Sequence, residues 1–366
     1  MRRAAAVSML CILLTIAAAA QQITMMVAPF DSASTGNLEL GKKTGIILNL
    51  QVWQTLRIPS TVDGKKTQGS ITWDVTSNPP TSYAEAEALA ARQREDIPQT
   101  VLWGRAWRYG PGTVVEAFLL IRTNVPGFDS QNVWSVPAPD GTNISVSLPR
   151  RQIDFSPIVL RGDLLPQLEQ PAGLVLYSSP QGSSTEGEVG DYFRALEQAP
   201  DSAKVILPSG VVGWIRLPRL SSTHTEVVDF SGGVIRILRH DWPGAFQLFS
   251  RVINNSHTPA AVLVDSYLYL ALASAQMGQS AYEWAAKAYG LSPYSKTVVQ
   301  YLCMSRMSDF AHLSPDDKAG DRGRALLDSL QTLVNHSNAL FQADDAWLKH
   351  VRLFLSGNRS SAESRR

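Results

Sequence analysis

Residues 204–215, Lys-Val-Ile-Leu-Pro-Ser-Gly-Val-Val-Gly-Trp-Ile, decide how this chain is organised. Apolar residues flank Pro208-Ser209-Gly210, and this pattern predicts a tight β-hairpin. Strand patterns separated by helical segments precede the hairpin. From residue 222 onward Pro becomes scarce, Ala and Leu become frequent, and apolar residues follow a helical period. The hairpin therefore closes a β-containing part of the chain and precedes an all-α part.

The composition is that of a globular, multidomain protein. The chain has 366 residues, of which 44% are hydrophobic and only 18% charged, so disorder throughout is excluded. This length predicts two or three domains. With 33 Lys and Arg against 32 Asp and Glu, the charge gives no electrostatic reason to expect nucleic acid or an anionic membrane as partner. We therefore expect protein, peptide or glycan partners.

The first twenty residues have the pattern of a secretory signal peptide. Arg2 and Arg3 precede an uncharged apolar stretch, residues 4–20, whose last residues Ala18-Ala19-Ala20 fit a cleavage site. This pattern predicts an exported protein, periplasmic or secreted, and a retained membrane anchor is the alternative. Without residues 1–20 the only cysteine is Cys303, so no intramolecular disulfide can form, and we expect a buried structural thiol. The mature chain has no other apolar segment long enough to cross a bilayer.

Residues 21–122 predict an α+β domain. Its expected elements alternate: strands at 23–30 and 67–75, helices at 45–56 and from the capping box Ser82-x-x-Glu85, and a long hairpin at 101–122. Trp103 and Trp107 lie on one face of the first hairpin strand. Core packing is favoured for them over a surface platform for glycan or peptide.

The order of these elements, beginning at Met25-Met26-Val27-Ala28-Pro29-Phe30, resembles the small α/β domain at the N-terminus of the Tol-system propeller protein and its periplasmic relatives. That domain is a docking module, so the resemblance implies protein contact and no catalysis. Residues 123–162, rich in Pro, Asn and Ser with short apolar alternations, predict a β-rich extension or linker.

Residues 163–221 resemble the bacterial Src-homology-3-like domain. Gly213-Trp214-Ile215 after a glycine turn matches the last strand of that family, and Leu174, Leu176 and Pro180 match its first strand. The resemblance implies a small all-β barrel with a binding cleft beside the Gly-Trp pair. The candidates for peptide contact there are Tyr177, Tyr192 and Trp214.

Residues 222–356 resemble an all-α array of tetratricopeptide repeats. Asp241-Trp242-Pro243-Gly244-Ala245 matches the turn and second helix of a repeat, and Pro259 and Pro293 stand one repeat length, 34 residues, apart. Small residues let neighbouring helix backbones approach closely. They are expected to do so at Ala271, Gly278, Ala281, Ala285 and Ala288.

We expect two degenerate repeats, or three at most, continued by capping helices near 295–310, 321–335 and 338–355. A disordered tail is predicted at 357–366. The inner groove is the usual binding face of a repeat array. The candidates to reach it are Tyr267, Gln276 and Lys287.

No motif predicts a catalytic, cofactor or metal site. Gly36-x-x-x-x-Gly41-Lys42-Lys43-Thr44 resembles a phosphate-binding loop, but Lys43 stands where such a loop needs Ser or Thr. A solvated loop with lysines at a helix start is the favoured interpretation. The histidines lack metal-site spacing, and no Gly-x-Ser-x-Gly elbow occurs. Glu186, Glu188 and Asp191 form an acidic cluster, for which solvated surface is favoured over a glycosidase site.

The sequence thus predicts an exported non-enzymatic adaptor or scaffold for protein or peptide partners in the cell envelope. One alternative is peptidoglycan or cell-wall recognition through the barrel. Another is an enzyme that acts on wall fragments and whose site is assembled from residues far apart in sequence, with no linear motif.

Overall fold

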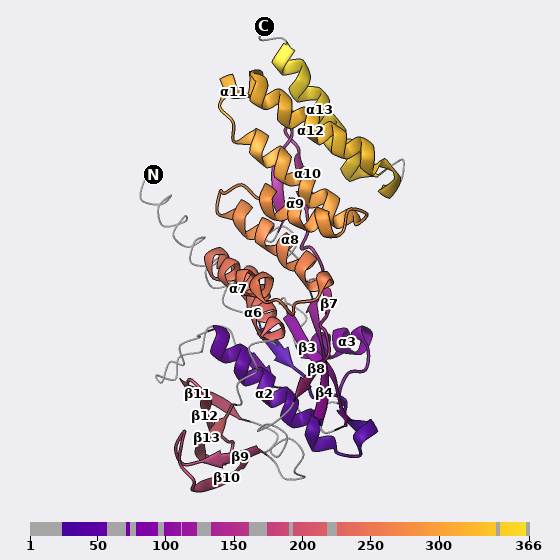
Figure 1. Ribbon diagram of the computed structural model, residues 1–366. Helices are drawn as coiled ribbons and strands as arrows, with labels where there is room; N and C mark the ends of the chain where they lie inside the picture. The colour runs from indigo at the N-terminus through magenta and orange to yellow at the C-terminus, as the bar shows by residue number, and fades with distance from the viewer. Residues whose placement is uncertain are drawn as a thin grey trace, which may run out of the picture. The chain divides into compact units, whose positions relative to one another are not determined.

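The computed structural model describes residues 24–56, 71–73, 78–93, 99–110, 112–122, 133–160, 174–189, 193–217, 225–341 and 345–363 (Figure 1). The predicted leader, residues 1–20, lies outside these ranges. The chain forms two compact units. The first, called the sheet unit, holds residues up to 128, 151–241 and 255–258, and the second, called the helical unit, holds 129–150, 242–254 and 259–366. Both helices and sheets are present, as the sequence predicted.

A six-stranded mixed sheet forms the centre of the sheet unit. Strand β1 runs parallel to both β2 and β3, while β3 and β4 form the predicted long antiparallel hairpin. The strands are β1 (Thr24–Val27), β2 (Ile71–Trp73), β3 (Gln99–Tyr109), β4 (Gly112–Arg122), β7 (Gln152–Asp154) and β8 (Ile158–Leu160). Their order is β2-β1-β3-β4-β7, with β8 also paired to β4.

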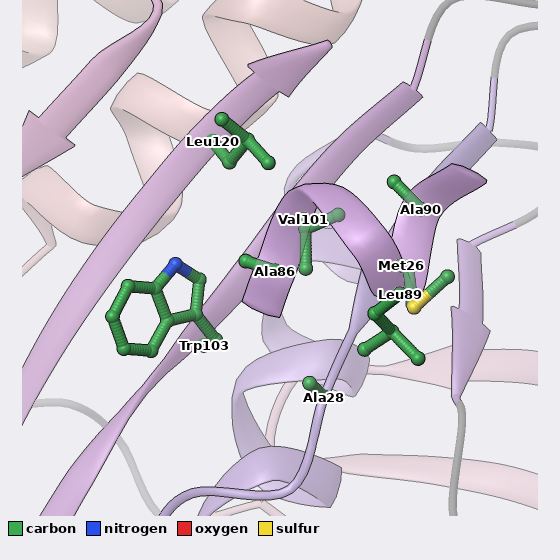
Figure 2. Close-up of a cluster of buried hydrophobic side chains, with 8 residues drawn as sticks. All are labelled: Met26, Ala28, Ala86, Leu89, Ala90, Val101, Trp103 and Leu120. Atoms are coloured by element: carbon green, nitrogen blue, oxygen red, sulfur yellow. The ribbon is translucent and has the colours of Figure 1, made fainter. Parts of the chain in front are cut away.

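One face of this sheet packs on helix α3 (Tyr83–Gln93), as Figure 2 shows. The capping residue Ser82 accepts a hydrogen bond from the backbone N–H of Glu85 at 3.3 Å. Trp103 is 2% exposed and stacks on Phe118 with ring centroids 4.6 Å apart. The prediction that Trp103 belongs to the core is therefore confirmed. The cluster consists of Met26, Ala28, Ala86, Leu89, Ala90, Val101, Trp103 and Leu120.

Helix α2 (Leu38–Leu56) shows that the loop expected at 36–44 was wrong for most of its length. The helix begins seven residues earlier than predicted, and Gly41, Lys43 and Thr44 are buried. A Cβ on Gly41 would lie 1.8 Å from the carbonyl oxygen of Phe30, so this glycine permits close packing of helix on strand. Burial lowers the pKa of Lys43 below its usual value.

A five-stranded antiparallel sheet follows in the same unit. It confirms the hairpin predicted at 204–215, with Gly210 in the left-handed conformation at the turn. The strands are β9 (Leu174–Tyr177), β10 (Thr185–Val189), β11 (Arg194–Ala199), β12 (Ser202–Ile206) and β13 (Val212–Arg216). Their order is β10-β9-β13-β12-β11, with β10 and β11 at the two ends. The described strands therefore form an open sheet and not the closed barrel that we expected.

Helix α6 (Glu226–Leu238) was predicted as the first half of a repeat, yet it belongs to the sheet unit. It packs against α2, where the Arg236 side chain donates to the carbonyl oxygen of Leu56. Phe230 meets Phe155 edge to face at 5.7 Å. Nearly all of α6 is buried, so tertiary packing and not the repeat pattern decides its place.

Helices of the second unit pack mainly on their neighbours in sequence (Figure 1). The helices are α7 (Trp242–Asn254), α8 (Ala260–Gln276), α9 (Tyr282–Leu291), α10 (Lys296–Ala311), α11 (Pro315–Ala319), α12 (Asp321–Ser337), η3 (Asn338–Leu340) and α13 (Ala346–Glu363). The helices predicted at 295–310 and 321–335 are confirmed. No helix in the described part of the chain is long and apolar enough to span a membrane.

The small residues of this array have two different roles. Ala271, Ala285 and Ala288 are fully buried, as expected where helices approach closely. Gly278 instead ends α8 in the left-handed conformation with φ 71°, and a Cβ added there would meet no atom within 4 Å. The backbone N–H of Gln279 donates to the carbonyl oxygen of Ser274, which completes the helix cap.

The β-rich extension expected at 123–162 is divided between the two units. Strands β5 (Trp134–Pro137) and β6 (Asn143–Val146) form a hairpin in the helical unit, whereas β7 and β8 join the six-stranded sheet. Within the helical unit the hydroxyl of Tyr301 donates to the carbonyl oxygen of Ser147 at 2.9 Å. Burial of this tyrosine raises its pKa.

The end of the chain also differs from the prediction. A helix was predicted over 338–355, whereas helix α13 begins at Ala346 and continues through Glu363. Arg359 contacts Asp328 of α12 at 2.7 Å, and the Asn358 amide donates to the carbonyl oxygen of Phe354. These contacts explain why residues 357–363 are helical where a disordered tail was predicted. Residues 364–366 lie outside the described ranges.

Candidate functional site

Two of the three candidates in the five-stranded sheet lie on one face of it. Trp214 on β13 pairs directly with Tyr177 on β9, and residues paired in this way project from the same face. Arg216, two residues after Trp214, also lies on this face, and its guanidinium carbon is 4.0 Å from the centre of the Tyr177 ring. The Lys204 ammonium is 5.7 Å from the Trp214 ring. Tyr192 lies outside the described residues.

Cationic side chains thus cover the aromatic rings of this face. The Arg216 guanidinium also donates to the carbonyl oxygen of Gly182 at 2.6 Å, which fixes it over the Tyr177 ring. Trp214 is 9% exposed. The Lys204 ammonium also contacts the Glu197 carboxylate at 3.4 Å, so the arrangement places one carbonyl-bound and one acid-paired cation beside a buried tryptophan and a half-buried tyrosine.

In the helical unit, Tyr267 and Lys287 are brought together by a residue that the sequence analysis did not select. Trp284 lies between them, with its ring 6.3 Å from the Tyr267 ring and 4.5 Å from the Lys287 ammonium. Phe246 meets Trp284 edge to face at 5.7 Å. The three half-buried rings come from the successive helices α7, α8 and α9. We call Phe246, Tyr267, Trp284 and Lys287 the aromatic surface.

The sequence contains one indication of the role of Trp284, namely its spacing from Lys287. This spacing can be interpreted only once the bounds of helix α9 are known. Trp284 and Lys287 are three residues apart on α9, so they share one side of it. Lys287 also contacts Glu283 at 2.7 Å. The helical register therefore places the Lys287 cation, itself paired with Glu283, beside the tryptophan ring.

Gln276 does not join the aromatic surface. It is exposed at the end of α8, and its amide donates to the carbonyl oxygen of Val133 at 3.4 Å. This contact joins α8 to the segment before β5 within the helical unit. The structure therefore shows Gln276 in contact with the unit's own backbone, and the aromatic surface is formed without it.

A pocket of about 610 Å³ lies elsewhere in the helical unit. It is formed by the turn between α8 and α9, the second half of α10, and parts of α11 and α12. Arg306 lines it and lies 3.4 Å from the centre of the Tyr282 ring. None of the sequence candidates that the structure describes lines this pocket.

The acidic cluster and Cys303 complete the set of chemistry-bearing residues that the sequence singled out. Glu186 and Glu188 are exposed on β10, and Asp191 lies outside the described residues. Burial raises the pKa of Cys303 to about 12, so its thiol stays protonated near neutral pH, as the predicted structural role requires. Across the described ranges, no three His, Cys, Asp or Glu side chains are grouped so that they could hold a metal ion.

The chain matches no protein-family model, no curated protein and no solved structure.

Proposed function

We propose that this protein is an exported, non-enzymatic adaptor that binds protein or peptide partners in the cell envelope. The observation that carries the proposal is the aromatic surface, where rings from three successive helices meet beside Lys287. Trp and Tyr dominate the binding energy of protein interfaces, because they offer large apolar area together with a polar edge. Half-buried rings can give up their remaining exposure to a partner without reorganising the fold.

The modular organisation supports the same proposal. The N-terminal part resembles the docking domain of the Tol-system propeller protein, the five-stranded sheet a Src-homology-3-like domain, and the helices tetratricopeptide repeats. Proteins of these three classes bind partners through surfaces and grooves. Several modest surfaces on one chain raise the total affinity, since the first contact increases the effective concentration at the second.

Capture from the envelope of the producing organism tests this function. The full chain, carrying an affinity tag, is cross-linked in place and its partners are identified by mass spectrometry. The Trp284→Ala variant should lose most of the partner recovered by the unchanged protein. Trp347→Ala is a matched control, because Trp347 is also half-buried in the helical unit but stacks on Phe341 at 5.7 Å, apart from the aromatic surface. Equal recovery by both variants would contradict the proposal.

A second candidate function is recognition of peptidoglycan through the five-stranded sheet. The cationic face formed by Lys204 and Arg216 beside Trp214 and Tyr177 favours it, because wall peptides carry carboxylates that a guanidinium binds well. Sedimentation with purified wall sacculi separates the two functions. Wall recognition predicts co-sedimentation that Lys204→Gln weakens and Trp284→Ala leaves unchanged.

The third expectation, an enzyme acting on wall fragments, stays a prediction that the described residues do not test. A screen of the full chain for turnover of such fragments, with Glu186→Gln and Glu188→Gln as variants, is its test.

A further inference from the structure

The pocket of the helical unit has the size and lining of a small-molecule site. Its volume of about 610 Å³ lies within the range of pockets that hold small ligands. Its charged lining consists of two arginines, Arg306 and Arg322, and two aspartates, Asp309 and Asp317, together with His312. The charges of the two arginines and the two aspartates cancel, so the pocket does not favour a polyanion or a polycation.

Arg306 is arranged to bind an anionic group. Its guanidinium lies flat enough on Tyr282 to bring its central carbon within 3.4 Å of the ring centre. Stacking of this kind fixes the guanidinium plane and leaves its N–H groups directed outward, where they can bind a carboxylate with two hydrogen bonds. The Nε of Arg306 is buried and has no hydrogen-bond partner within the described part of the chain.

Asp309 supplies the opposite charge beside it. It follows Arg306 by three residues on α10, so the two side chains leave the same side of the helix with Cβ atoms about 5–6 Å apart. Neither has an ion-pair partner among the residues that the structure describes. Asp317, in contrast, already accepts a hydrogen bond from the Ser314 hydroxyl at 2.8 Å.

We propose that this pocket binds a short zwitterionic peptide, with the ligand carboxylate on Arg306 and the ligand ammonium on Asp309. Arg322 adds a second cation for the carboxylate. The pocket volume of about 610 Å³ leaves room for more than one residue, which favours a dipeptide over a single amino acid. A dipeptide is therefore the expected class of ligand. This inference does not rest on the proposed adaptor function, since it uses none of the residues of the aromatic surface.

Calorimetric titration of the full chain with alanyl-alanine tests the charge pattern. N-acetyl-alanyl-alanine lacks the ammonium, alanyl-alanine amide lacks the carboxylate, and free alanine has the shorter spacing. Each should bind about tenfold more weakly than alanyl-alanine, because each loses one charge-assisted interaction or its geometry. Failure of alanyl-alanine to bind at about 1 mM, or equal binding of all four compounds, would overturn the proposal.

Charge-neutral variants test whether Arg306 binds the ligand carboxylate and Asp309 the ligand ammonium. Arg306→Gln should remove the preference for alanyl-alanine over its amide, and Asp309→Asn should remove the preference over the acetylated form. Arg322→Gln is the second variant for the carboxylate, in case Arg306→Gln does not fold. Arg322 is exposed, so its replacement should leave the fold intact while weakening the preference for alanyl-alanine over its amide. Arg324→Gln is the matched control on α12, because Arg324 pairs with Asp321 and does not line the pocket. Unchanged preferences in folded Arg306→Gln and Asp309→Asn proteins would show that the assignment is wrong.

Discussion

Trp103 and Trp284 each contact two other aromatic rings, yet the two clusters differ in what covers them. In the sheet unit, Trp103 is 2% exposed beneath α3 and contacts Tyr83 and Phe118 at 5.3 and 4.6 Å. In the helical unit, Trp284 is half-buried and contacts Phe246 and Tyr267 at 5.7 and 6.3 Å. Aromatic contact alone therefore does not indicate a binding surface. The remaining exposure of the rings separates a structural cluster from a candidate site.

Truncation of the two tryptophans should separate stability from binding. Trp103→Ala should lower the free energy of unfolding of the sheet unit by about 3–5 kcal/mol, because it leaves a large cavity in the core. Trp284→Ala should cost only about 1–2 kcal/mol, since much of its ring is already in water. Denaturant unfolding followed by circular dichroism measures both changes. A larger loss for Trp284→Ala would mean that its cluster is a structural core.

Two glycines extend the comparison from side chains to backbone. Gly41→Ala in the sheet unit should cost about 2–3 kcal/mol, because the added Cβ would meet the Phe30 carbonyl and force the helix away from the strand. Gly278→Ala in the helical unit should cost about 1 kcal/mol, since its site is spacious and only the left-handed conformation opposes a Cβ. Thermal unfolding of the two variants measures the difference. Equal costs would contradict the close packing assigned to Gly41.

Local patterns predicted the elements well where each element is stabilised by its own sequence. The hairpin at 101–122, the hairpin at 204–215 and the helix from residue 82 are of this kind, since their turns, alternation and capping residues lie within the element. The burial of Ala271, Ala285 and Ala288 was predictable for the same reason.

The errors concern contacts between distant segments. Tyr301 binds the backbone of Ser147 across 154 residues, and no local pattern reports that the hairpin of β5 and β6 belongs with α10. The aromatic surface could be predicted only in part, for the same reason. Tyr267 and Lys287 were predictable from helical position, but their convergence on Trp284 depends on how α8 and α9 pack. The pocket is built from the turn after α8 together with α10, α11 and α12, so its lining could not be predicted from any single stretch.

Two acids give opposite pH dependence to the two units. In the sheet unit, burial raises the pKa of Glu226, and the nearby charge of Asp229 raises it further. In the helical unit, the hydrogen bond from Lys296 lowers the pKa of Asp345. A raised folded-state pKa means that the folded chain binds more protons than the unfolded one, so this part of the stability falls as pH rises above about 4.5. A lowered pKa has the reverse effect, and that stability is lost as pH falls below about 3.8.

Neutral variants should therefore move the two units in opposite directions near pH 7. Glu226→Gln should raise the melting temperature, because a buried charge is removed while an amide oxygen can still accept the hydrogen bond from Asn255. Asp345→Asn should lower the melting temperature slightly, because Lys296 loses the carboxylate that it contacts at 2.6 Å at a partly exposed position.

Melting curves at pH 4 and pH 7 measure both effects. The gain in melting temperature from Glu226→Gln should shrink at pH 4, where the native carboxyl is already protonated. If that gain were the same at both pH values, the charge of Glu226 would not be its cause, and the improvement would have to come from packing of the new amide against Asn255.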